Sequence, residues 1–201
     1  MANTFGAAVG TRRRPIIVAA FVVGLLVAFF VCAFLAFQTG AFDIAGDTPH
    51  RQPVYWLLQK IRERSITVRA GDEVVPNDLA DPKRIASGAA QYAEMCSSCH
   101  LAPGMERTEI SRSLYPRAPE LRRGSALTPG EEFWMVKHGI KMTGMPAWGV
   151  THDDKIIWDV VAFLRKLPGL SAEDYQALVN DAPKTHDEMM RQMDMGKGPA
   201  P

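Results

Sequence analysis

The longest apolar run of the chain, residues 15–37, contains no charged side chain and reads PIIVAAFVVGLLVAFFVCAFLAF. As a helix rising ~1.5 Å per residue it spans roughly 35 Å, enough to cross a hydrocarbon core of ~30 Å. A cleaved signal peptide has an apolar region of only ~7–15 residues, and no small-x-small cleavage site follows this run. The pattern therefore predicts a single uncleaved transmembrane anchor over residues 15–38.

Charged residues flank the anchor unequally. Arg12, Arg13 and Arg14 lie directly before it, and the first acidic residues after it are Asp43 and Asp47. The positive-inside rule places the basic flank in the cytoplasm. We therefore expect a cytoplasmic N-terminus over residues 1–14, and the remainder of the chain on the periplasmic (extracytoplasmic) side of the inner membrane.

Beyond the anchor, apolar residues recur at helical spacing and no segment alternates as a strand would. Residues 53–65 form one such segment, with Val54, Leu57, Leu58 and Ile61 on one face. Periodicity identifies an apolar face but not what covers it. This helix either packs on the rest of the protein, or lies at the membrane surface or against a partner.

The rest of the pattern indicates an all-α domain. Thr128-Pro-Gly-Glu131 is a capping box with proline at the first helical position. Pro168 ends the last strongly periodic helix. The predicted elements are helices from residue 82 into a cysteine pair, from 129 to about 138, from 154 to 168 and shortly after 171, with a connector over 72–82 and a long loop over 110–125.

The charge balance excludes one class of function. The chain carries 23 basic and 22 acidic residues, and without the three arginines before the anchor 20 basic residues remain against the same 22. The part beyond the anchor is thus slightly acidic overall. A nucleic-acid-binding protein needs a basic patch or stripe, so we expect no nucleic acid partner.

The cysteines carry the decisive motif. Cys32 lies inside the apolar run, whereas Cys96 and Cys99 form a close pair followed at once by His100. Two thiols one helical turn apart match the two vinyl groups of haem, and the adjacent histidine can bind the iron. A structural zinc site needs about four ligands, a thioredoxin-like pair a βαβ setting, and a disulfide leaves His100 without a role. The motif predicts one covalently bound haem c.

The second axial ligand of the iron has several candidates. Methionine and histidine both bind haem iron, and a Met/His pair raises the reduction potential. Met142, Met145, His138 and His152 all follow the motif at a distance that a loop could bring to the haem. Spacing alone leaves the four open.

The segment 82–170 resembles the class I, single-haem c-type cytochromes. Gly88 and Tyr92 precede the cysteine pair as a small residue and an aromatic do in that family, and Phe163 matches the aromatic of its C-terminal helix. Met145 before Pro-Ala resembles its distal ligand loop. The resemblance implies a cytochrome c fold with His100 and Met145 as the axial ligands.

The resemblance also implies the haem surroundings. Pro119-x-Leu121 resembles the segment whose proline carbonyl accepts a hydrogen bond from the haem-binding histidine, and Trp148 is expected near the haem. The expected organisation is a cytoplasmic N-terminus (1–14), an anchor (15–38), a juxtamembrane helix and linker (39–82), a haem domain (83–170) and a C-terminal helix with a methionine-rich tail (171–201).

The expected function is single-electron transfer to or from a membrane-bound respiratory or oxidoreductase complex, without catalysis by this chain alone. One alternative is a haem-carrying subunit of a larger enzyme assembly. A second is copper handling, because thioethers are soft ligands that suit Cu(I). The tail that could bind it contains His186, Met189, Met190, Met193 and Met195.

Overall fold

The computed structural model describes residues 10–41 and 43–196, with side chains over 14–41 and 43–192. Within these residues the protein is built from α-helices and short 3-10 helices and has no strand, which confirms the predicted all-α class. The chain divides into two compact units, Met1–Thr48 and Pro49–Pro201. The side chains of Arg12 and Arg13, on which the expected orientation depends, lie outside the described residues.

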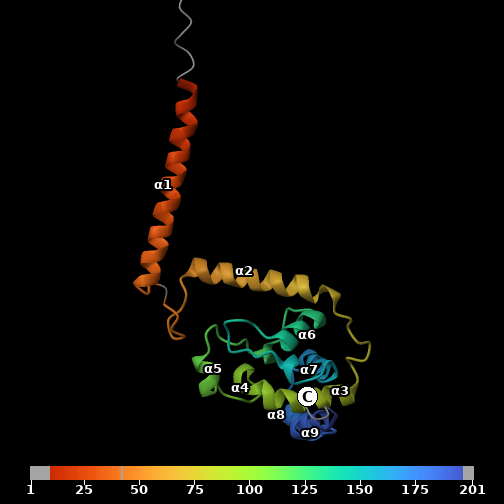
Figure 1. Cartoon of the computed structure of the whole chain (residues 1–201). Helices are drawn as coiled ribbons and strands as arrows, with labels where there is room; N and C mark the ends of the chain where they lie inside the picture. Colours follow the sequence, from red (N-terminus) through yellow and green to blue (C-terminus); the bar gives the residue numbers. More distant parts are fainter. Residues whose placement is uncertain (1–9, 42, 197–201) are drawn as a thin grey trace, which may run out of the picture. The chain divides into compact units, whose positions relative to one another are not determined.

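The first unit consists mainly of helix α1, Gly10–Gln38 (Figure 1). The helix starts before the apolar run, with Pro15 in its interior. Its segment Arg14–Gln38 is long and apolar enough to cross a membrane, and none of the apolar side chains there is buried within the protein. A helix that is apolar on all sides and has no protein around it is suited to lipid.

The core of the second unit is the pair of helices α3, Pro82–Met95, and α7, Asp154–Lys166. Gly88 lets the two backbones come close, since a Cβ there would lie 1.9 Å from the carbonyl oxygen of Asp159. The Tyr92 and Phe163 rings meet with centroids 5.2 Å apart, and the Tyr92 hydroxyl donates to the Leu101 carbonyl. Helix α8, Ala172–Asn180, adds Tyr175 to this cluster.

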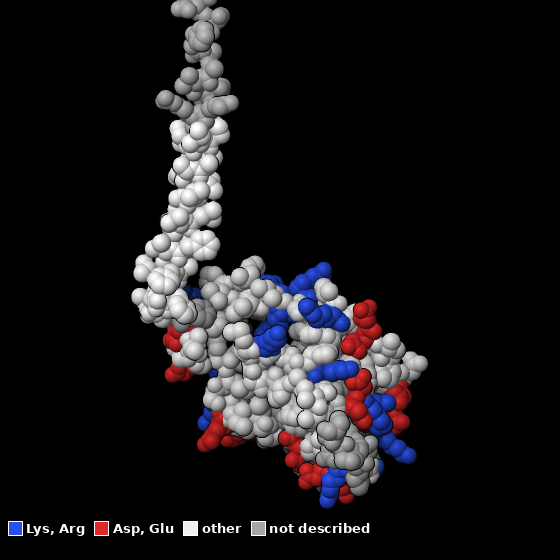
Figure 2. All heavy atoms as spheres, in the orientation of Figure 1, with Lys and Arg blue, Asp and Glu red and all other residues white. Residues whose placement is uncertain are grey.

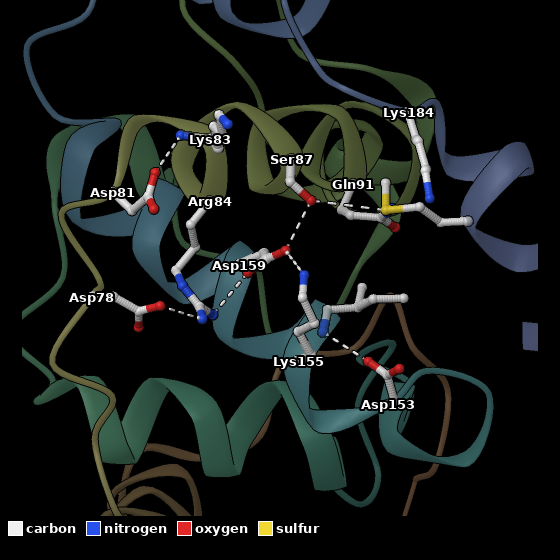
Figure 3. Close-up of polar contacts among 12 residues, drawn as sticks. Asp78, Asp81, Lys83, Arg84, Ser87, Gln91, Asp153, Lys155, Asp159 and Lys184 are labelled. Carbon is white, nitrogen blue, oxygen red and sulfur yellow. Dashed lines mark hydrogen bonds and ion pairs between the residues drawn. The ribbon is translucent and has the colours of Figure 1, made fainter. Parts of the chain in front are cut away.

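A polar network fixes how α3 and α7 face each other (Figure 3). Buried Asp159 accepts hydrogen bonds from Arg84 Nη1 at 2.8 Å and from Ser87 Oγ at 2.9 Å, and pairs with Lys155 at 3.3 Å. Arg84 also binds Asp78 at 2.9 Å. Because a buried carboxylate is costly without partners, this arrangement favours one register of the two helices.

Helix α6, Pro129–His138, packs on α7 and begins with the predicted capping box, in which both Thr128 and Glu131 bond the opposite backbone N–H. The rings of Phe133 and Trp158 are stacked with their centroids 4.1 Å apart, and this contact joins α6 to α7. The predicted helices of the second unit are thus confirmed. Among the short elements of this unit are η1 Ala70–Asp72, α4 Ser97–His100 and η3 Trp148–Val150.

The prediction of one long loop over 110–125 was wrong. Helix α5, Glu109–Ser113, and η2, Leu121–Arg123, lie in this stretch. Thr108 caps α5 by accepting from the Ser111 N–H. Both elements are about one turn long, too short for hydrophobic periodicity to reveal.

Helix α2, Gln52–Arg69, packs on α6 and η1 but not through the apolar face that the sequence suggested. Ile66 is buried, and Tyr55 and Gln59 on the same side are half-buried. Val54, Leu57, Leu58 and Ile61 lie on the opposite side and remain exposed. The helix therefore has an inner face on the domain and a second, apolar outer face.

Candidate functional site

One large cavity of ≈ 640 Å³ lies within the second unit. Its volume falls in the ~300–1,000 Å³ range of small-molecule and cofactor sites. The cavity gathers side chains from the cysteine motif, the segment before η2, the loop after α6, and α2. Of the predicted site residues, it is lined by Cys96, Cys99, His100, Pro119, Leu121, Met145 and Trp148.

His100 ends the short helix α4. Its Nδ1 lies 2.8 Å from the carbonyl oxygen of Pro119, so Nδ1–H donates and Nε2 carries the free lone pair. Burial lowers the pKa of His100, while the bond to Pro119 opposes that shift. A neutral imidazole oriented through its other nitrogen is the form in which histidine binds a metal.

Neither Cys96 nor Cys99 is in a disulfide in the described chain. Burial, and to a smaller extent the neighbouring Cys99, raises the pKa of Cys96 to about 12. A thiol with so high a pKa is protonated at neutral pH and is a poor participant in disulfide exchange. Cys96 is therefore unlike the low-pKa attacking cysteine of a dithiol redox enzyme.

Met145 lies in the loop between α6 and η3. Gly139 starts this loop with φ +63°, and a Cβ there would lie 2.6 Å from Pro146. The Met145 carbonyl accepts from the Ile140 N–H at 3.3 Å, and the Met145 N–H donates to Thr143 Oγ1 at 3.1 Å. These contacts close the loop tightly and hold Met145 against the apolar cluster of α6 and α7.

The structure separates the four axial-ligand candidates. Met142 is 88% exposed and does not line the cavity. His138 lies beside Trp134 on the surface, and buried His152 packs between Trp148 and His186. Met145 is the one candidate of the four that lines the cavity.

Sequence reasoning missed several residues of the cavity wall. Met95 and Met135 also line the cavity. Tyr55 and Arg62 reach it from α2. Arg62 is half-buried and forms no hydrogen bond or ion pair with any other described residue. Nothing in the local sequence around α2 carried this information.

The residues present fit haem. The cavity holds two thiols, an oriented neutral imidazole and a thioether, which are the groups by which c-type haem is held. Its remaining wall is mainly apolar, and Arg62 offers a cation to a carboxylate such as those that haem carries. The fold and this donor set define a c-type cytochrome domain.

Residues 83–164 match the family described as cytochrome c oxidase, cbb3-type, subunit III. This segment of the chain is accordingly a c-type cytochrome domain, and it carries covalently bound haem c. Comparisons with curated proteins and with solved structures give no match. Helix α2 and the helices after α7 lie outside the matched segment.

The methionine-rich tail is helical as α9, His186–Gly196. Met189 Sδ accepts from Gln91 Nε2 at 3.2 Å, and His186 Nδ1 lies 2.6 Å from Gln91 Oε1. Both contacts attach α9 to α3 rather than to the cavity. The side chains of Met193 and Met195 lie outside the described residues, and copper binding by the tail stays an untested alternative to the expected carrier function.

A buried carboxyl group in the cavity wall makes stability depend on pH. Glu132 is 3% exposed, its Oε2 has no hydrogen-bond partner among the described residues, and Arg165 lies 3.5 Å from Oε1. Burial raises the pKa of Glu132 above its usual 4.5. The folded protein therefore binds the proton of Glu132 more tightly than the unfolded chain does. The protonated Glu132 contributes its full share to the free energy of unfolding below about pH 4.5, the usual pKa of the group. This contribution is lost as the pH rises through the pKa that Glu132 has in the folded protein.

We expect Glu132→Gln to remove this pH dependence, because the amide does not ionise. Urea unfolding midpoints of the haem-loaded protein, measured from about pH 4 to pH 7, should show the variant gaining stability relative to wild type as the pH rises. A difference between the two proteins that stays constant over this range would contradict the expectation.

Proposed function

We propose that this chain is a membrane-anchored electron carrier with one haem, bound through Cys96 and Cys99 and with His100 and Met145 as axial ligands. The observation that carries the proposal is that a single cavity is lined by all four of these residues. The bound haem iron supplies a one-electron couple. His100, held by Pro119, and Met145, held by its closed loop, keep fixed positions, so little reorganisation accompanies a change of charge.

The arginines at the start of α1, just before its apolar run, support a haem domain on the periplasmic side, under the positive-inside rule. The anchor confines the carrier to the plane of the membrane and raises its effective concentration near membrane-bound partners. We infer a membrane redox complex as donor or acceptor.

A second candidate is a permanent subunit of such a complex. It is favoured by the matched family, whose description names an oxidase subunit. Gentle solubilisation of native membranes separates the two: a carrier migrates by itself, and a subunit migrates with partner chains in fixed ratio.

The proposed haem site predicts two simple results. The haem should remain on the chain in a denaturing gel, where peroxidase staining reveals it, because thioether bonds survive denaturation.

Carbon monoxide should leave the absorbance of the reduced protein unchanged, because His100 and Met145 hold both axial positions. Rapid carbon monoxide binding would instead indicate an open site and a catalytic role.

The half-buried arginine of α2 predicts an effect on potential. Removing a positive charge from the cavity wall favours the oxidised, more positive haem, so Arg62→Met should lower the reduction potential. A charge of this kind interacts by about 0.5–1.5 kcal/mol, which for one electron corresponds to roughly 20–60 mV. Redox titration of the purified protein measures the shift.

The matched control is Arg64→Met, on the same helix. Arg64 is exposed and does not line the cavity, so solvent screens its charge and the shift should stay below about 15 mV. Equal shifts in the two variants would mean that Arg62 has no special relation to the haem.

A further inference from the structure

The outer face of α2 is an apolar stripe that the fold leaves exposed. The stripe consists of Val54, Leu57, Leu58, Ile61 and Val68, each between 37% and 57% exposed. Their spacing of three, four and seven residues places them on one side of the helix. Because the inner face already packs on the domain, the stripe is not needed for the fold itself.

Basic side chains border the stripe. Lys60 and Arg64 lie along one edge of it and Arg69 along the other, with Arg51 just before the helix. Glu63 is the acidic residue of α2 and is paired with Lys60 at 2.7 Å. Figure 2 shows basic side chains gathered over α2 on the face in view. An apolar face with basic margins is the pattern of helices that lie in the plane of a membrane surface.

The chain itself keeps α2 near a bilayer. Residues 39–51 join α1 to α2, and at ~3.3–3.6 Å per residue they reach at most roughly 45 Å. Once α1 spans a membrane, α2 cannot leave the vicinity of its surface. The tether therefore gives lipid a high local concentration around the stripe, whereas a soluble partner has no such advantage.

We propose that α2 lies along the surface of the bilayer that α1 spans, with its apolar stripe at the boundary between headgroups and acyl chains and its basic residues against anionic phospholipid headgroups. The proposal rests on the proposed function in one respect, the use of α1 as the anchor. A second copy of the chain fits the stripe less well, because a symmetric contact through it would bring the basic margins of both copies together.

The test uses the full haem-loaded chain, as the single protein in vesicles of phosphatidylcholine and phosphatidylglycerol that contain a phospholipid with a photoreactive diazirine on its acyl chain. After illumination, mass spectrometry of peptides locates the attached lipid. We expect attachment within both α1 and α2. The triple variant Leu57→Gln, Ile61→Gln, Val68→Gln should lose at least about tenfold of the attachment in α2, since burial of each large apolar side chain contributes to partition, and should keep that in α1.

Val74→Gln is the matched control, because Val74 is 85% exposed but lies outside α2; it should leave attachment in α2 unchanged. Vesicles of phosphatidylcholine alone should give weaker attachment in α2 if the basic margins bind anionic headgroups. Attachment in α1 but not in α2 would overturn the proposal and leave the anchor intact. Attachment in neither helix would overturn the anchor as well. Cross-links between copies through α2 would assign the stripe to self-association instead.

Discussion

Replacing Met145, the proposed axial ligand, by alanine is expected to lower the reduction potential by on the order of 100 mV or more, because the axial ligand is among the strongest controls of haem potential and methionine raises it. The weak absorbance band that arises from charge transfer between methionine sulfur and ferric iron should disappear. The haem should stay attached, since in the proposed site Cys96 and Cys99 would hold it independently of the Met145 loop. Absorbance spectra and redox titration of the purified variant measure both effects.

Two control variants make this test specific. Met142→Ala changes an exposed residue of the same loop and should leave the band and the potential unchanged. Met135→Leu changes another methionine of the cavity wall and should keep the band. If Met135→Leu removes the band and Met145→Ala does not, the ligand is Met135 and the assignment here is wrong.

Replacing Gly88 by alanine is expected to destabilise the domain by about 3 kcal/mol or more. Helix propensity alone would favour alanine by roughly 0.5–1 kcal/mol in an α-helix. The new Cβ, however, would lie 1.9 Å from the Asp159 carbonyl oxygen, and the nearest atoms belong to backbone that cannot move aside. Packing therefore outweighs propensity, and α3 and α7 must separate.

Urea unfolding of the haem-loaded chain, followed by the helical circular dichroism signal, measures the loss. Gly71→Ala is the control, because a Cβ there meets nothing within 4 Å. It should change the free energy of unfolding by less than about 1 kcal/mol. Equal effects of the two substitutions would show that the close approach of α3 and α7 is not what Gly88 provides.

The sequence predicted those features of the protein that a short stretch of residues determines. The anchor follows from one uninterrupted apolar run, and the start of α6 from the pairing of Thr128 with Glu131. The cofactor class follows from the spacing of Cys96, Cys99 and His100. In each case the residues that interact lie within a few positions of each other or share one linear pattern.

What the sequence could not predict depends on contacts between distant segments. Periodicity identified an apolar face on α2, but the domain packs against the other side through Ile66. Arg62 and Met135 reached the cavity wall without any motif to mark them. Which side of a helix is covered is decided by the elements around it, and that information is spread over the whole chain.

Helix α2 contributes to the cavity wall through its inner face, and this gives the protein a thermodynamic link between two surfaces. A cofactor that contacts α2 stabilises its docking on the domain, and by reciprocity anything that pulls α2 away weakens the hold on the cofactor by the same factor. Binding at the outer face of α2 can thus be thermodynamically coupled to the cavity, because the two faces belong to the same helix. A ligand of the outer face that binds docked and undocked α2 with different affinity would shift this docking, and with it the surroundings and the reduction potential of the haem.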